Sequence, residues 1–208
     1  MSTSPSRRAF LSSTAVMAAA AGLRGQAAPP ARQAPPVILP RPVALGPDNF
    51  AVRASGWKAT RLVEYAASIG ADSLFISDLE SFESLEDAAL RKLREDATAR
   101  NVALHVGTWS VCPTSKAFRA QNGTAEEQLA RVIRVAQQLG SPVARVVLGT
   151  WEDRLTPGGI GRHIDSLVGV LKGGRSRALD AGVKIAVENH AGDMRAEELA
   201  AVVEMAGR

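Results

Sequence analysis

The chain has 208 residues, of which 46% are hydrophobic and 22% charged, a composition that excludes wholesale disorder and leaves room for a packed core. Its single cysteine, Cys112, excludes an intrachain disulfide framework and any multi-cysteine zinc site. The formal net charge of +4 arises mostly before residue 28, where there are three arginines and no acidic residue. The near-neutral remainder argues against a nucleic-acid-binding protein.

Residues 1–27 have the layout of an export signal. Arg7 and Arg8 precede a mildly apolar, alanine-rich segment, and small residues follow at 25–27. The paired arginines before Phe10 resemble the twin-arginine signal, which carries folded proteins across the bacterial inner membrane. We therefore expect a periplasmic or extracellular protein; a basic, disordered tail is the alternative. No apolar run reaches the roughly 20 residues of a membrane-spanning helix, so no stable membrane span is expected.

Residues 28–47 contain seven prolines, a density that favours extended polyproline geometry over a packed core. We interpret this segment as a linker. One folded domain is expected over residues 48–208.

From residue 50 onward, apolar runs alternate with amphipathic helices. Each run of apolar residues with period 2 predicts a buried strand, and each stripe at i, i+3, i+4 predicts a helix. Strands are expected near residues 50–52, 74–76, 102–106, 143–148 and 183–187.

A helix is expected after each strand. The apolar stripes are Leu62, Val63, Ala66 and Ile69, then Leu85, Ala89, Leu93 and Ala97, then Leu129, Val132, Ile133, Ala136 and Leu139, then Ile164, Leu167, Val168 and Leu171. The last helix is expected over residues 195–206. Thr124 and Glu127 form a predicted capping box. The helices are expected to end at residues that tolerate a left-handed conformation: Gly70, Asn101, Gly140, Gly182 and Gly207.

This alternation predicts an α/β fold with right-handed βα units and a parallel sheet. A complete (β/α)₈ barrel requires about 250 residues. We expect a TIM-barrel type of fold with about five of its eight βα units present. A sixth strand would begin where the chain stops, so a C-terminal truncation is expected.

Polar residues follow the fifth predicted strand, where parallel-sheet proteins place their ligands. Alternation directs Val183, Ile185 and Val187 toward the helices, and Glu188 and His190 toward the opposite, lumen-facing side. A carboxylate and an imidazole on one strand face can share a divalent metal or a proton relay. Alternatively, Glu188 anchors a loop amide or an arginine, and His190 is structural.

The third predicted strand repeats this pattern with His105 and Trp109. His105 faces the lumen, and the Trp109 ring offers a flat wall to a sugar. A structural role for His105 is the alternative. The other polar residues are interpreted without a catalytic role. Asp193 is predicted to be the N-cap of the last helix and His163 to be structural, whereas four loop carboxylates are predicted to be solvated: Asp78, Glu80, Glu152 and Asp153. Cys112 lacks an evident thiolate-stabilising partner and is expected to be inert.

Residues 182–193, GVKIAVENHAGD, resemble the fifth-strand signature of the xylose-isomerase-like TIM-barrel superfamily, and residues 145–151 are similar to its fourth strand. That superfamily contains sugar-phosphate isomerases and epimerases and the endonuclease IV branch. The resemblance implies that Glu188 binds a divalent metal (Mn, Mg or Zn) and acts as an acid/base carboxylate. It also implies His190 as a possible substrate contact. The family's remaining ligands, an Asp, a His and a second Glu, lie on later strands without counterparts in this sequence.

The expected function is therefore a metal-dependent isomerase or epimerase of a sugar or sugar derivative, acting by proton abstraction next to a carbonyl. Catalysis by this chain depends on ligands that it lacks. A non-catalytic carbohydrate-binding or structural protein of the cell envelope is the alternative. A DNA-repair enzyme is disfavoured by the near-neutral charge and by only three histidines. The oligomeric state and the identity of the sugar do not follow from the sequence.

Overall fold

The structure, a computed structural model, describes residues 43–207. The predicted export signal and most of the predicted proline-rich linker lie outside these residues. Within the described range, no helix is both long and apolar enough to cross a membrane.

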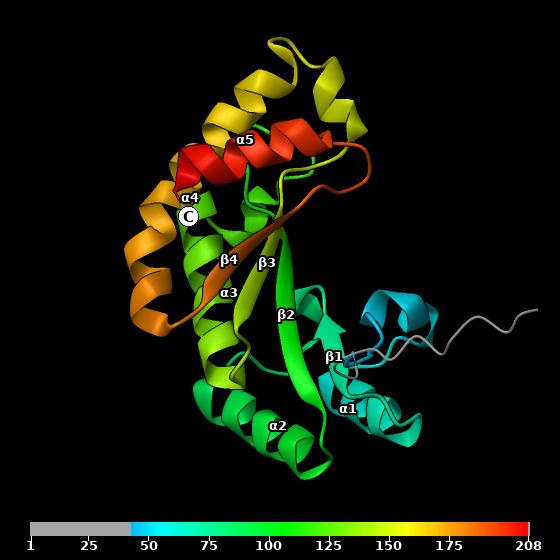
Figure 1. Ribbon diagram of the computed structural model, residues 1–208. Coiled ribbons are helices and arrows are strands. Elements are labelled where there is room, and N and C mark those ends of the chain that lie inside the picture. Colours follow the sequence, from blue (N-terminus) through cyan, green and yellow to red (C-terminus); the bar gives the residue numbers. More distant parts are fainter. Residues whose placement is uncertain (1–42, 208) are drawn as a thin grey trace, which may run out of the picture. The chain divides into compact units, whose positions relative to one another are not determined.

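Four strands form one parallel sheet in the order β1-β2-β3-β4 (Figure 1). They are β1 (Ser73–Ile76), β2 (Ala103–Ser110), β3 (Val143–Val147) and β4 (Lys184–Glu188). Each strand pairs with its neighbour in the chain, and a helix lies between consecutive strands. This is the strand order of a (β/α) barrel, so the predicted α/β fold class is confirmed as a partial TIM-barrel-type fold.

Five α-helices accompany the sheet, and their apolar stripes form the core with the strands. They are α1 (Ala59–Ser68), α2 (Asp87–Ala99), α3 (Ala125–Leu139), α4 (Gly159–Ala181) and α5 (Ala196–Ala206). Burial of these stripes is the main stabilising contribution, at about 25 cal/mol per Å² of apolar surface. The opposite face of the sheet carries no helix among the described residues (Figure 1).

The helix ends confirm the expected chemistry. Gly70, Asn101, Gly140 and Gly182 have φ angles between 57° and 71°, as residues closing helices in the left-handed conformation do. Gly207 also has a positive φ, of 87°, but its ψ of 128° lies outside that conformation. The capping box of α3 is also present, with both of its hydrogen bonds made. Local sequence signals therefore set these boundaries.

The predicted first strand is wrong. Residues 50–52 lie in a 3₁₀ helix, η1 (Asn49–Ser55), because the Asp48 side chain accepts a hydrogen bond from the Phe50 amide and turns the chain away from the sheet. The segment that runs beside β1 is residues 45–48. Its carbonyls accept hydrogen bonds from the backbone of β1 and of the residue preceding it, and Asp48 forms an isolated parallel bridge with Phe75.

Two members of the predicted apolar stripes are not buried. Ile69 is 53% exposed because α1 ends at Ser68, which places Ile69 beyond the helix. In α2 the buried face is formed by Leu90, Leu93 and Ala97, so Ala89 points to solvent. The error at Ile69 concerns a helix boundary, where sequence periodicity carries little information, and the error at Ala89 concerns which face of α2 is buried.

Candidate functional site

The lumen-facing side of β4 ends in Glu188. Ile185 and Val187 pack against the core, whereas Lys184 and Glu188 are exposed, as the period of two predicted. The Glu188 side chain is 45% exposed. A ligand at the carboxyl end of the sheet can therefore reach this carboxylate.

Arg145 of β3 occupies the lumen face beside Glu188, with only 9% of the residue exposed. Its Nη1 donates to the Thr108 carbonyl oxygen at 2.8 Å, and its Nη2 donates to the Ser77 carbonyl oxygen at 3.2 Å. The guanidinium also lies 5.1 Å from the centroid of the Phe75 ring, within the range of a cation–π contact. The side chain therefore crosses the sheet from β3 to the end of β1.

The charge of Arg145 is balanced by Glu188. Arg145 Nε lies 3.2 Å from Glu188 Oε2, although this Nε has no hydrogen-bond partner among the described residues. The two groups thus form an ion pair without an aligned hydrogen bond. Burial lowers the pKa of Arg145, and Glu188 acts in the opposite direction. Since a guanidinium stays protonated in proteins, the pairing of Glu188 with an arginine, considered above as an alternative, is present in the structure.

Gly107 of β2 makes room for this arrangement. A Cβ at position 107 would lie 2.9 Å from Arg145 Nε and 3.1 Å from the Phe75 ring. Both distances are shorter than ordinary van der Waals contacts, so a side chain here would displace the guanidinium or the ring. The absence of a side chain at Gly107 is therefore part of the lumen's packing.

Trp109 and His190 meet at the carboxyl ends of β2 and β4. Their ring centroids are 4.9 Å apart at an interplanar angle of 77°, an edge-to-face contact. His190 Nδ1 lies 3.4 Å from the Gly149 carbonyl oxygen, which fixes the imidazole against the loop after β3. The structure thus brings together two of the predicted site residues from distant strands.

His105 lies deeper in the sheet. Its backbone pairs with Phe75 in the middle of the β1–β2 ladder, two side-chain positions before Trp109 on the same face. No hydrogen bond or ion pair of the described residues connects it to Glu188, His190 or Trp109. Of the four predicted site residues, it is therefore the one that the structure leaves apart from the strand ends.

A second polar group lies beside Trp109. The Arg119 guanidinium is 5.5 Å from the Trp109 ring centroid, and its Nη1 is 3.1 Å from Asp78 and 2.8 Å from Glu80. A cavity of about 300 Å³ adjoins these residues and Thr108. Asp78 and Glu80, predicted to be solvated, thus form ion pairs at the rim of the strand ends.

The prediction that Asp193 caps the last helix is wrong, because Arg195 occupies the N-cap position of α5. Asp193 is fully buried and accepts hydrogen bonds from the amides of Gly149 at 3.1 Å and His190 at 2.8 Å. Burial raises the pKa of Asp193 against the opposing effect of these bonds. Its carboxylate fastens the turn that carries His190 to the loop after β3.

Asp153, predicted to be a solvated loop residue, is also fully buried. It accepts hydrogen bonds from Ser115 Oγ at 2.7 Å and from the amides of Lys116 at 2.8 Å and Thr150 at 3.0 Å. Burial favours a higher pKa for Asp153, but these bonds together hold it below its usual value. This buried carboxylate joins the loops after β2 and β3.

His163 is structural, as expected. It is buried, and its two ring nitrogens lie 2.8 Å from Thr114 Oγ1 and 2.6 Å from Thr156 Oγ1. Cys112 is buried beside it and donates to the His163 carbonyl oxygen at 3.3 Å. The Cys112 thiol and both ring nitrogens of His163 are thus engaged by neighbouring polar groups.

The described residues do not complete a metal site. Over residues 43–207, no group of three or more His, Cys, Asp or Glu side chains could hold a metal ion. Glu188 faces a guanidinium, and the neighbouring carboxylate Asp193 is already bonded to backbone amides. This donor set does not fit a divalent cation by itself.

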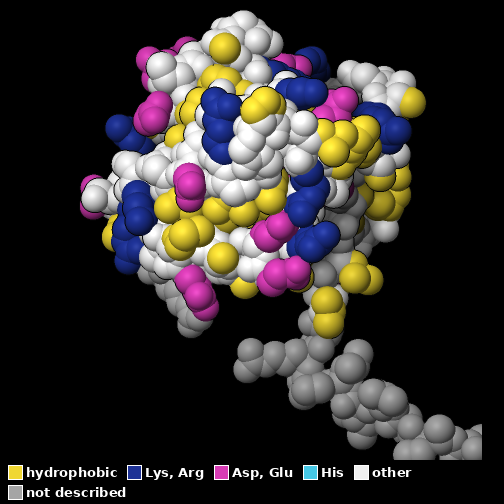
Figure 2. Space-filling view, turned by 90° about the horizontal axis from the view of Figure 1, so that it is seen from above, with side chains coloured by type: hydrophobic (Ala, Val, Ile, Leu, Met, Phe, Trp, Pro, Cys, Tyr) yellow, Lys and Arg dark blue, Asp and Glu magenta, His cyan; other side chains and the backbone are white. Residues whose placement is uncertain are grey.

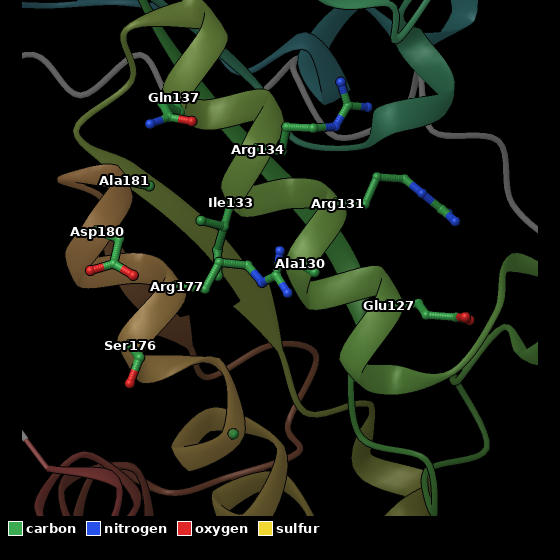
Figure 3. Close-up of a pocket in the computed structure, with 11 residues that line it drawn as sticks. Glu127, Ala130, Arg131, Ile133, Arg134, Gln137, Ser176, Arg177, Asp180 and Ala181 are labelled. Atoms are coloured by element: carbon green, nitrogen blue, oxygen red, sulfur yellow. The ribbon is translucent and has the colours of Figure 1, made fainter.

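A larger cavity lies elsewhere, in an open groove of about 820 Å³ between α3 and α4 (Figure 3). Its charges are mixed: Arg131, Arg134 and Arg177 stand with Glu127 and Asp180. Arg134 is already engaged by Asp87. The groove is on the helical side of the sheet, away from the strand ends, so we place the candidate site at the strand ends despite its smaller volume.

The surface seen in Figure 2 carries basic and acidic side chains interspersed, without a broad field of one sign on that face. This distribution agrees with the near-neutral charge of the residues after the predicted signal.

No protein-family model matches the chain, and no curated protein matches it. Solved structures do resemble it. A D-psicose 3-epimerase crystallised in the presence of D-fructose superposes with a TM-score of 0.57 at 19% identity, covering 73% of this chain and 55% of the epimerase. A xylose isomerase domain protein from Planctomyces limnophilus superposes with a TM-score of 0.51 at 12% identity, covering 70% of this chain and 54% of that protein.

These similarities establish the fold. At such identities they do not establish the activity. The chain spans about half the length of each of these two structures.

Proposed function

We propose that the chain carries part of the active site of a sugar isomerase or epimerase, with Glu188 as an acid/base carboxylate. The observation that carries this proposal is the position of Glu188: half-exposed, at the carboxyl end of β4, and paired with a buried cation. Similarity of the fold to a D-psicose 3-epimerase and to a xylose isomerase domain protein supports it. We include export by the paired arginines at positions 7 and 8 in the proposal.

The proposed step is proton transfer at the carbon next to a sugar carbonyl. The Glu188 carboxylate takes the proton, the C–H electron pair forms the C=C bond of an enediolate, and the carbonyl π pair moves to oxygen. Return of the proton by Glu188 to the neighbouring carbon, with transfer of the hydroxyl proton between the two enediolate oxygens, gives an isomer. An epimer forms when a second proton donor, on the face opposite Glu188, delivers a proton to the original carbon. Trp109 and His190 supply an aromatic wall beside the carboxylate, of the kind that packs against a sugar ring.

A divalent metal remains part of the prediction that rests on the family resemblance, with Glu188 as one ligand. A metal bound through Glu188 would need ligands beyond those of residues 43–207, because this donor set does not fit a cation by itself. The proposed abstraction step uses the Glu188 carboxylate of this chain only.

The proposal is tested by incubating the full chain with D-psicose, D-fructose and D-xylose, with and without Mn²⁺ or Mg²⁺, and separating the sugars by chromatography. We expect conversion by the unaltered chain and loss of conversion by about 100-fold or more in Glu188→Gln. Glu152→Gln is the matched control, because Glu152 is an exposed carboxylate on the loop after β3. Equal conversion by the unaltered chain and Glu188→Gln would overturn the assignment.

A further inference from the structure

Arg145 contacts the three other strand ends of the lumen face. It is anchored to the carbonyl of Thr108 on β2 and to the carbonyl of Ser77 after β1, and it pairs with Glu188 of β4. The two hydrogen bonds use its Nη atoms, so the guanidinium is held in one orientation. Its Nε lies 3.2 Å from Glu188 Oε2, an ion-pair contact without an aligned hydrogen bond.

The surrounding residues leave the guanidinium little freedom. The Phe75 ring lies 5.1 Å from it on one side, and the bare backbone of Gly107 lies against it. A long cationic side chain normally loses conformational freedom when it forms an ion pair. Here the hydrogen bonds to two other strands hold the cation independently of Glu188. Glu188 is the more exposed partner, with 45% of its side chain exposed against 10% for Arg145.

We propose that Arg145 is a positioning residue that fixes the Glu188 carboxylate at the carboxyl end of the sheet. This inference rests on the proposed function for its consequence, because a fixed carboxylate matters most if Glu188 transfers protons. The contact itself is independent of any activity. Removal of the guanidinium frees the carboxylate to rotate into solvent, which raises its chemical accessibility and lowers turnover.

The direct test is carboxylate labelling of the full chain with a water-soluble carbodiimide and an amine, read peptide by peptide by mass spectrometry. Arg145→Ala and Arg145→Gln are compared with the unaltered chain. The Gln variant retains amide donors for the backbone carbonyls but has no charge, so it serves if the Ala variant does not fold. We expect labelling of Glu188 to rise several-fold in both variants, by a factor of about five for each kcal/mol of lost interaction.

The matched control is another arginine–carboxylate pair of the chain, Arg154 with Glu198, which lies at 2.7 Å. Arg154→Ala is expected to raise the labelling of Glu198 and to leave Glu188 unchanged, whereas the Arg145 variants do the reverse. Unchanged labelling of Glu188 in both Arg145 variants overturns the inference. So does an equal rise at Glu188 and Glu198, because it shows general loosening of the fold.

A chemical-rescue arm connects the contact to turnover. In Arg145→Ala, methylguanidinium at millimolar concentration is expected to restore protection of Glu188 and, if the chain converts sugars, to restore part of an approximately 100-fold loss in kcat/KM. Ethylammonium, a cation of different shape, is the control and is expected to rescue poorly. Absence of sugar conversion in every form contradicts the proposed function and leaves the labelling result to decide the role of Arg145. Full turnover and full protection without added guanidinium overturn that role.

Discussion

Arg145 contacts residues of all three other strands or strand ends on the lumen face. Burying a lone guanidinium costs several kcal/mol, and this cost is offset by two carbonyl acceptors, the Phe75 ring and the Glu188 carboxylate. All four partners come from other strands or strand ends. The lumen face is therefore packed around a buried guanidinium. We expect substitutions of residues that contact Arg145 to lower the free energy of unfolding.

Gly107→Ala tests this packing. The new Cβ would lie 2.9 Å from Arg145 Nε and 3.1 Å from the Phe75 ring, so we expect destabilisation of about 1–3 kcal/mol from overpacking. Urea unfolding followed by tryptophan fluorescence measures it. Gly169→Ala is the control: a Cβ at Gly169, in α4, would meet nothing within 4 Å, and the change should stabilise by about 0.5–1 kcal/mol. Equal effects of both substitutions would contradict the tight packing at Gly107.

For single residues, the sequence predicts which face of the sheet a side chain occupies, but it does not predict which groups that side chain contacts. The period of two placed Glu188 and Ile185 on opposite faces correctly. It did not indicate that Arg145, inside an apolar run, would pair with Glu188. Nor did it show that Asp153 and Asp193 would be fully buried, because their partners are loop amides, and such contacts depend on how distant loops meet. An arginine in phase with lumen-facing positions was the one available signal.

Hydrogen bonds from loop side chains connect neighbouring βα units at the strand ends. Arg154, in the 3₁₀ helix η4 (Trp151–Leu155), donates to both carboxylate oxygens of Glu198 on α5, at 2.7 and 3.0 Å, and to the Asp193 carbonyl at 2.8 Å. These bonds join the loop after β3 to the helix that follows β4. The position of α5 therefore depends on a bidentate ion pair as well as on apolar burial.

The pH dependence of this contact follows from the pKa of Glu198. The hydrogen bonds from Arg154 and then from the Arg195 amide lower that pKa to about 2 from its usual 4.5. Because the folded-state pKa is the lower one, the stabilisation is complete above about pH 4.5 and is lost as the pH falls toward 2. The pair is partly solvent-screened, so we expect Glu198→Gln to cost about 1 kcal/mol at neutral pH. Urea midpoints of both forms should converge in acid, and a gap that stays constant down to about pH 2 would contradict this account.

The sequence predicts the boundaries of helices and strands correctly where residues adjacent in the chain determine them. The five helix closures and the α3 capping box depend on residues adjacent in the chain, and these were predictable. The first strand was misplaced by several residues, because its apolar residues 50–52 are turned out of the sheet by the Asp48 cap. A three-residue apolar run does not distinguish a strand from a 3₁₀ turn.

At the scale of the molecule, the sheet of the described residues has β4 at one edge. An apolar groove of about 360 Å³ runs beside β4, between α4 and α5, and Leu179 and Val203 are exposed near it. Glu188, Trp109 and His190 lie outside this groove, at the carboxyl ends of β2 and β4. The proposed chemistry requires that these three residues be sufficient to abstract a proton from a sugar.

The most direct measurement is solvent exchange. The full chain is incubated in D₂O with D-psicose or D-fructose, with and without Mn²⁺, and deuterium at the carbons next to the carbonyl is followed by proton NMR. Proton abstraction by Glu188 predicts time-dependent loss of the signal at one of these carbons, and Glu188→Gln should abolish it while Glu152→Gln does not. A signal that persists in the unaltered chain under every condition, or that is lost equally in Glu188→Gln, would contradict the account.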